Sequence, residues 1–202
     1  MRPAGDGAVL LQAGSVAAAH RLRAALEAAA PAGVRETVVG AGSVLVLLDP
    51  LGCDLAAIRR VALDPAGAAA VGPARTVRIP VVYDGADLAE VAELTGLPEA
   101  EVVRRHAGAS YTVAFMGFSP GFGYLTGLDP ALRVPRRDSP RQQVPAGAVA
   151  VAGEYAGVYP QATPGGWRLL GRTRLAVFDP ARTPPALLAP GDSVRFEPEP
   201  AP

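Results

Sequence analysis

One run of about sixty residues, from Tyr111 to Thr173, constrains the fold of this chain more than any other part of its sequence. The run combines frequent Gly and Pro with aromatic residues and Arg, without low-complexity repetition. Gly permits positive φ and close backbone approach and Pro fixes φ, and helix periodicity disappears from Tyr111 onward. Short apolar segments between such punctuation predict a barrel or sandwich of short strands, with loops shaped to hold a ligand.

The strands predicted from Tyr111 onward are the segments 111–118, 147–153, 157–160, 167–173, 175–179 and 192–198. Two predicted helices precede them. The first begins after Asp87 as its N-cap and ends at Gly96, and the second begins at Pro98 and ends at Gly108.

The first third of the chain alternates strand and helix patterns. Strands are predicted over 8–13, 34–40, 43–49 and 75–84, and helices over 15–30 and 54–63. The order β-α-β-β-α-β is that of a ferredoxin-like split βαβ unit. A stretch rich in Ala, Gly and Pro, 64–74, leads out of it. We therefore predict an α+β chain with an N-terminal ferredoxin-like α/β domain over 1–74 and a β-barrel domain over 75–202.

Composition excludes several functional classes. The 19 basic residues are all Arg and balance 19 acidic residues, and a nucleic-acid-binding surface needs a clustered excess of positive charge. Without Lys, the chain offers neither a Schiff base nor a P-loop phosphate ligand. The single Cys53 excludes an intrachain disulfide, and two scattered histidines give no metal-site spacing. No leader or long apolar stretch is present, so we expect a cytoplasmic protein without a membrane anchor.

The segment GFSPGFGYL, 117–125, contains a bare G-x-S-x-G pattern at 117–121. Pro120 follows Ser119 directly and removes the backbone N–H that would form half of an oxyanion hole. The chain also has no downstream His to complete a triad. We therefore reject a serine hydrolase and interpret the segment as a wide turn.

Other residues keep two interpretations open. His106, at the end of the second predicted helix, suits a general base or substrate ligand, but it also suits a cation that interacts with the end carbonyls. The arginines of PRRDSPR, 135–141, are able to grip a carboxylate or phosphate, or to lie on a solvated loop. Trp167 follows the turn Pro164-Gly165-Gly166 and is either a core anchor or a ligand platform.

Taken in order, these segments resemble the family of the 5-oxoprolinase B subunit (PxpB), also called KipI and allophanate hydrolase subunit 1. The resemblance extends over nearly the whole chain. It is carried by GDGAVLLQAG, IPVVYDGADLAEVAELTGL, the helix ending in His106, GFSPGFGYL, PRRDSPR, VPAGAVAVAG, GVYPQATPGGWRLLGRT and PGDSVRF. Their joint spacing is far more specific than any motif alone.

The resemblance implies a small α/β domain followed by a cyclophilin-like β-barrel. It implies two partners, a C-type subunit similar to KipA and to allophanate hydrolase subunit 2, and an A-type subunit that is lactam-utilisation-like. With such partners, proteins of the family hydrolyse 5-oxo-L-proline to L-glutamate using ATP. Because this chain has no ATP-cradling motif, we expect the complex to use ATP and a partner to bind it.

The positions carried over from the family form one candidate pocket. We assign catalytic roles to His106, as a proton carrier, and to Arg141, as an anion ligand. The predicted substrate-binding residues are Phe115, Gly117, Phe118, Pro120, Phe122, Arg136, Pro164, Gly165, Gly166, Trp167 and Arg172. No metal site is predicted.

Three functional hypotheses follow from the resemblance. The first is a subunit of the ATP-dependent oxoprolinase, in which phosphorylation of the amide oxygen activates the lactam and an arginine holds a carboxylate or phosphate. The second is a regulatory module that inhibits a sensor histidine kinase and needs only an exposed apolar patch. The third is a carboxyltransferase-type domain of a urea- or allophanate-utilising system, which requires a biotin carrier.

Overall fold

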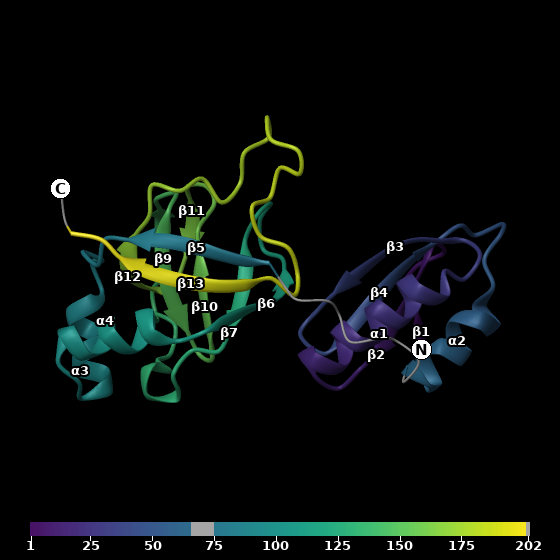
Figure 1. The fold of residues 1–202 in the computed structure, drawn as a ribbon, viewed down its shortest axis with the longest axis horizontal. Helices are drawn as coiled ribbons and strands as arrows, with labels where there is room; N and C mark the ends of the chain where they lie inside the picture. The colour runs from purple at the N-terminus through teal and green to yellow at the C-terminus, as the bar shows by residue number, and fades with distance from the viewer. Residues whose placement is uncertain (66–74, 201–202) are drawn as a thin grey trace. The chain divides into compact units, whose positions relative to one another are not determined.

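The computed structural model describes residues 1–65 and 75–200, and the chain divides into two compact units, Met1–Ala74 and Arg75–Pro202 (Figure 1). Each unit has its own sheet and its own buried core.

The first unit is a four-stranded antiparallel sheet with two helices. Its elements are β1 (Arg2–Pro3), β2 (Ala8–Gln12), α1 (Val16–Ala29), β3 (Val34–Val39), β4 (Ser43–Leu48) and α2 (Leu55–Leu63). The strand order is β1-β2-β4-β3, so β4 lies between the two strands that α1 connects. The side chains of Ser15 and Asp54 cap the two helices by accepting backbone hydrogen bonds.

The predicted ferredoxin-like unit is wrong in its last strand. Residues 75–84 contain a strand, β5 (Thr76–Val81), but it pairs in parallel with β13 (Ser193–Pro198) in the sheet of the second unit. The place beside β2 is taken by β1. Pairing with β13 runs through six residue pairs and lets β5 bury alternate side chains in the barrel core. The alternating sequence predicts a strand, but only tertiary structure selects its partner.

The second unit is built around a seven-stranded sheet in the order β12-β9-β10-β7-β6-β13-β5 (Figure 1). Its further elements are α3 (Leu88–Thr95), α4 (Glu99–Gly108), β6 (Tyr111–Met116), β7 (Gly123–Thr126), η2 (Pro130–Leu132), β8 (Arg141–Val144), β9 (Ala148–Ala152), β10 (Tyr155–Val158), β11 (Thr163–Gly165) and β12 (Arg168–Arg172). Strands β8 and β11 form a separate antiparallel pair. Segment 175–179, predicted as a strand, contributes only an isolated bridge between Phe178 and Ala186.

The seven-stranded sheet is nearly closed into a barrel. At its two edges, Val82 and Arg172 exchange a pair of backbone hydrogen bonds of 2.9 Å each. This seam requires glycine at position 171, because a Cβ there would lie 2.3 Å from the carbonyl oxygen of Val82. The architecture agrees with the predicted cyclophilin-like barrel, and α3 and α4 contact β12 and β13 on its outside.

Small aliphatic residues fill much of the barrel interior. Strand β9 reads AVAVA and is buried along its whole length, because both of its faces are covered. The core of the barrel is mostly Val and Leu, joined by the aromatic residues Tyr111 and Phe196. A second, smaller group of buried residues gathers around Phe122, Tyr159 and Trp167, and it borders the candidate site.

Candidate functional site

The turn between β6 and β7 carries the most conspicuous aromatic residue of the barrel unit. The N–H of Gly117 donates to the carbonyl of Phe122 (3.1 Å), and the N–H of Phe122 donates to the carbonyl of Ser119 (3.0 Å). Phe118 at the tip has a φ of +69° and is 61% exposed. A bulky residue in the left-handed region costs about 1–3 kcal/mol, and such strain concentrates at functional sites.

A pocket of about 230 Å³ opens beside this turn. It is lined by Phe118, Phe122, Tyr124, Arg136, Pro140, Tyr159, Pro164, Gly165, Gly166 and Trp167. Seven of the thirteen residues predicted for the site line it, although they come from segments almost fifty residues apart in the sequence. The turn, the arginine-rich segment and the Trp segment therefore do converge on one cavity.

Aromatic rings form the walls of the pocket. The ring of Phe122 lies roughly perpendicular to those of Trp167 and Tyr159, with centroid separations of 5.3 Å in both cases. Trp167 is only 5% exposed, so it is an anchor of the smaller core as well as a wall of the pocket. Gly165 lets the backbone pass over Tyr159, because a Cβ there would lie 2.4 Å from the tyrosine hydroxyl oxygen. A cavity with such walls suits a flat, partly apolar ligand.

Arg136 supplies the positive charge of this pocket. It is the only arginine among the residues that line it, its side chain is exposed, and it forms no hydrogen bond or ion pair with the described part of the chain. The hydroxyl of Tyr159 also stays protonated over the neutral range, since burial raises the pKa of Tyr159 above its ordinary value. The pocket thus offers a cation and a hydroxyl to an anionic or polar ligand.

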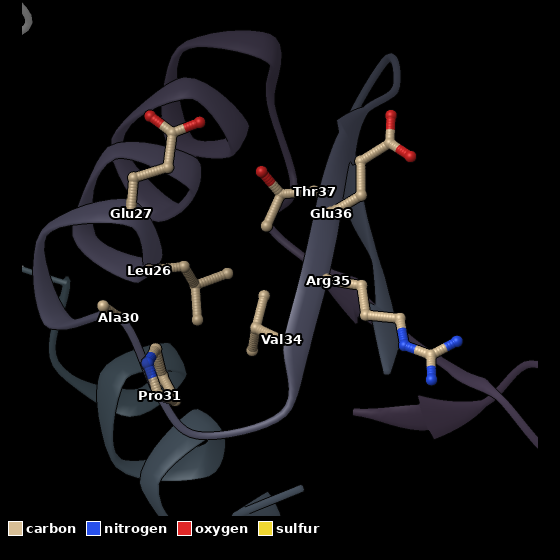
Figure 2. A pocket seen from close by; sticks show the side chains of 8 residues that line it. All are labelled: Leu26, Glu27, Ala30, Pro31, Val34, Arg35, Glu36 and Thr37. Carbon is tan, nitrogen blue, oxygen red and sulfur yellow. The ribbon is translucent and has the colours of Figure 1, made fainter. Parts of the chain in front are cut away.

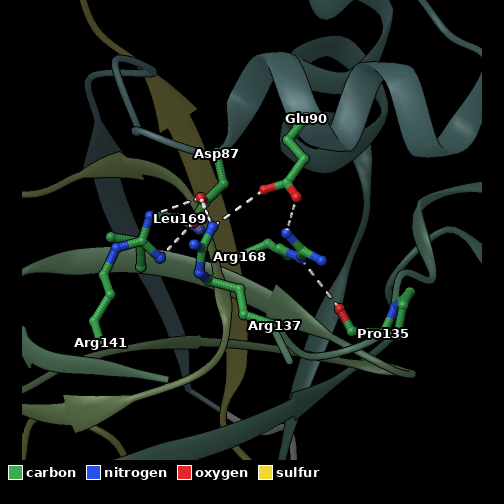
Figure 3. A network of polar contacts seen from close by, with 7 residues as sticks. All are labelled: Asp87, Glu90, Pro135, Arg137, Arg141, Arg168 and Leu169. Carbon is green, nitrogen blue, oxygen red and sulfur yellow. Dashed lines mark hydrogen bonds and ion pairs between the residues drawn. The ribbon is translucent and has the colours of Figure 1, made fainter. Parts of the chain in front are cut away.

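The neighbouring arginines are held by carboxylates at the start of α3 (Figure 3). Asp87 accepts hydrogen bonds from Arg141 at 2.7 and 2.9 Å and from Arg137 at 2.9 Å. Glu90 accepts a hydrogen bond from Arg137 at 3.2 Å and forms an ion pair with Arg168. Arg141, predicted as an anion ligand, is therefore bound to Asp87 and does not line the pocket.

Burial alone raises the pKa of Asp87, but the hydrogen bonds from Arg141 and from the backbone N–H of Leu169, with the charges of Arg141 and Arg137, lower it below its ordinary value. The same hydrogen bond to Asp87 raises the pKa of Arg141. The pair remains charged on both sides at neutral pH.

His106 lies elsewhere in the barrel unit. It is 0% exposed, its Nδ1 is 2.8 Å from the hydroxyl of Tyr83, and its ring stacks on Phe196 at 4.6 Å between centroids. Burial lowers the pKa of His106 to about 3, so the ring is neutral. Its position at the end of α4 places it in the core and not on the pocket, and we leave it out of the proposed site.

The remaining predicted residues lie around the pocket or away from it. Phe115 does not line the pocket but stacks on Tyr124, which does, at 4.4 Å between ring centroids, and Gly117 and Pro120 belong to the turn. Arg172 binds Asp84 at 2.8 Å and borders a different, smaller cavity.

Sequence reasoning misses four residues of this region. Tyr124, Pro140 and Tyr159 line the pocket, and Asp87 binds Arg137 and Arg141 beside it. Tyr124 and Tyr159 stand within segments that carry the family resemblance, but strand alternation alone does not tell which face of a nearly closed sheet meets a cavity. The sequence predicts Asp87 as a helix cap, although its side chain makes no cap hydrogen bond.

A larger cavity, of about 410 Å³, lies in the first unit between the end of α1 and β3 (Figure 2). Leu26 and Val34 face each other across it, and Thr37 lies above them. None of the predicted site residues lines this cavity. Over residues 1–65 and 75–200, no group of three or more His, Cys, Asp or Glu side chains forms a metal site, and no helix has the length and apolarity to cross a membrane.

Comparisons with known proteins agree with this architecture. Residues 1–188 match the family model described as "Carboxyltransferase domain, subdomain C and D". A protein of Escherichia coli O157:H7 named as the B subunit of 5-oxoprolinase is 49% identical over 171 residues, which are 82% of this chain and 78% of that protein. Its namesake in Bacillus subtilis (strain 168) is 48% identical over 125 residues, 60% of this chain and 52% of that protein.

Solved structures show the same fold. The crystal structure of TTHA0988 is 41% identical with a TM-score of 0.84, over 96% of this chain and 40% of that one. The urea amidolyase of K. lactis shares 21% identity and a TM-score of 0.72 over 98% of this chain and 14% of its own, a likeness of fold alone. The match over residues 1–188 shows that this chain belongs to the carboxyltransferase domain family, subdomains C and D, and the chain is similar to proteins named as the 5-oxoprolinase B subunit.

Proposed function

We propose that this chain is one subunit of an ATP-dependent 5-oxoprolinase, which converts 5-oxo-L-proline to L-glutamate. The observation that carries the proposal is the 49% identity to a protein named as the B subunit of 5-oxoprolinase. Because that name implies further subunits, we propose that the chain acts with an A-type subunit, which is lactam-utilisation-like, and a C-type subunit similar to KipA.

The pocket beside Phe118 is the proposed binding site for the substrate. 5-Oxo-L-proline is a flat five-membered lactam that carries one carboxylate. The aromatic walls suit the ring, and Arg136 is able to bind the carboxylate through its planar fork of donors. The protonated hydroxyl of Tyr159 is a suitable donor to the lactam carbonyl.

The chemistry explains why such a protein needs partners. In the proposed reaction, hydrolysis of the lactam, which uses one water molecule, is coupled to hydrolysis of one ATP, which uses a second, and the products are glutamate, ADP and phosphate. The chain contains no Lys and no P-loop, so we assign ATP binding to one of the partners. In this proposal the chain binds and orients the lactam, and the phosphoryl donor comes from the partner.

The test is reconstitution of the complex. We expect this chain, produced together with its A-type and C-type partners, to release glutamate from 5-oxo-L-proline only when ATP is present. Omission of this chain should abolish the release. Unchanged release without the chain, or none from the complete set, contradicts the proposal. An ATP-only control without substrate separates idle ATP hydrolysis from turnover.

A carboxyltransferase-type activity is the second candidate, favoured by the description of the matching family model. It predicts that the chain, with its C-type partner, transfers the labelled carboxyl group of carboxybiotin to the nitrogen of an added amide acceptor and leaves free biotin. Glutamate release in the first experiment without this carboxybiotin reaction favours the oxoprolinase, and the reverse result favours the carboxyltransferase.

A further inference from the structure

Asp87 is a buried carboxylate that joins three separate segments of the barrel unit (Figure 3). It is 1% exposed and accepts four hydrogen bonds. Three come from Arg137 and Arg141, and the fourth comes from the backbone N–H of Leu169 at 2.7 Å. Both oxygens are thus fully used, which explains why the side chain does not cap α3 as its position predicts.

Each partner of Asp87 is tied directly to the wall of the pocket. Arg137 follows Arg136 in the chain, and its backbone N–H donates to the carbonyl of Gly166 at 2.8 Å. Arg141 begins β8 and lies opposite Gly165 of β11. Leu169 lies two residues after Trp167. The arginine-rich segment and the Trp segment are therefore both anchored to the start of α3 through one carboxylate.

The same contacts divide the arginines of segment 135–141 by role. Arg137 and Arg141 are bound to Asp87, whereas Arg136 lines the pocket. Without Asp87, both guanidinium groups would lose their shared buried partner, and Arg137 would keep only its contact with Glu90. Arg141 would be left unpaired and would compete with Arg136 for an anion. The carboxylate thus fixes both the shape of the wall and the identity of the cation that meets the ligand.

We infer that Asp87 is a positioning residue that assembles the wall of the pocket and leaves Arg136 as its anion-binding cation. The role as a ligand site rests on the proposed function, but the assembly of the wall does not. A structural experiment therefore tests the assembly of the wall, and a binding experiment tests the role of the pocket as a ligand site.

Trp167 provides the structural reporter, because it is the only tryptophan of the chain and lines the pocket. We expect Asp87→Asn in the full chain to shift the Trp167 emission to longer wavelength and to increase its quenching by acrylamide at least about twofold. Far-UV circular dichroism should stay unchanged. Arg141→Gln, which removes a partly exposed partner and spares the carboxylate, should give a smaller shift in the same direction.

Asp192→Asn is the matched control. Asp192 is also largely buried in the barrel unit and is held by one arginine, Arg75, and one backbone N–H, that of Ala189, but it does not line the pocket. We expect this variant to lower the thermal midpoint without changing Trp167 emission. Equal spectra for Asp87→Asn and Asp192→Asn overturn the inference, even if both variants are less stable. If Asp87→Asn fails to fold, Arg141→Gln with wild-type emission overturns it.

The binding experiment titrates 5-oxo-L-proline against Trp167 emission. We expect Asp87→Asn to weaken binding at least about tenfold, which corresponds to about 1.4 kcal/mol, and Asp192→Asn to leave it unchanged. Wild-type affinity in Asp87→Asn overturns the inference. A wild-type chain that shows no response, with the Asp87→Asn emission shift present, contradicts the proposed substrate site and leaves the positioning role supported.

Discussion

The barrel unit contains two aromatic clusters that differ in what surrounds them. The closed cluster consists of Tyr83, His106, Tyr111 and Phe196, and the open cluster consists of Phe118, Phe122, Tyr124, Tyr159 and Trp167. Both contain rings in edge-to-face contact at about 5 to 6 Å. The open cluster borders the cavity beside Phe118, whereas the rings of the closed cluster pack on one another.

The polar groups of the two clusters show the consequence. In the closed cluster the tyrosine hydroxyls bond internally, from Tyr111 to the carbonyl of His106 at 2.9 Å and between Tyr83 and the His106 ring at 2.8 Å. In the open cluster the aromatic wall ends at Arg136 and the exposed Phe118. Similar residues thus build a core in one place and a candidate site in the other, because the open cluster leaves groups available to a ligand.

The largest expected effect on stability is in the closed cluster. Phe196→Ala removes a fully buried ring that stacks on His106, and we expect it to lower the free energy of unfolding by about 3–5 kcal/mol. Denaturant unfolding measures this loss. A loss below about 1 kcal/mol would show that the closed cluster is not a core.

The second prediction concerns pH. Because burial lowers the folded-state pKa of His106 from 6.5 to about 3, the unfolded chain binds more protons in that range. The stability that this group contributes is therefore present above pH 6.5 and is lost as pH falls toward 3. Between about pH 7 and pH 5 we expect this histidine to account for about 2 kcal/mol of lost unfolding free energy.

His106→Phe tests this assignment, because it keeps a ring in the cluster and removes the titration. Burial raises the pKa values of Tyr83 and Tyr111, so neither facing hydroxyl titrates in this range. Denaturant unfolding at both pH values should show a flatter dependence in the variant. If the unfolding free energy of the variant and of the wild type changes equally with pH, His106 is not the group that titrates. Loss of glutamate release by a folded His106→Phe complex would support the predicted catalytic role of His106.

The third prediction moves to the open cluster. Phe118→Gly relieves the positive φ and removes an exposed ring, so we expect the free energy of unfolding to change by less than about 1 kcal/mol. The KM of the reconstituted complex for 5-oxo-L-proline should rise several-fold. Leu94→Ala, at an exposed apolar residue of α3, is the control that should change neither quantity. An unchanged KM in Phe118→Gly would show that the ring of Phe118 does not contribute to substrate binding.

The smallest expected effect on stability belongs to Arg136→Gln, within about 0.5 kcal/mol, because this side chain is exposed. The expected effect on binding is large, a rise in KM of about tenfold or more, since the carboxylate loses its cation. Arg133→Gln, at an exposed arginine outside the pocket, should behave as wild type. Equal KM values for the two variants would show that Arg136 does not bind the substrate.

Local signals in the sequence predict most elements but not their neighbours. Gly96 ends α3 with a φ of +67°, and Ser15 caps α1, because both effects depend on a few adjacent residues. Strand β5 is equally clear as a strand, yet its sheet is decided by β13, more than one hundred residues later. The sequence around Asp87 predicts a helix cap, but arginines about fifty residues away donate hydrogen bonds to both of its carboxylate oxygens.

The sequence by itself determined most of the strands and the helix ends, since these depend on backbone preferences and local spacing, but it did not predict β7, β8 or β11. The resemblance to the family indicated the glycine-aromatic-arginine segments that converge on the pocket. Only the tertiary structure decided which residues of those segments meet the cavity. His106 lies in the core and Arg141 is bound to Asp87, whereas Arg136 and Tyr159 line the pocket. The physical reason is that burial and charge pairing depend on every segment packed around a side chain, and a nearly closed barrel brings together segments that are distant in sequence.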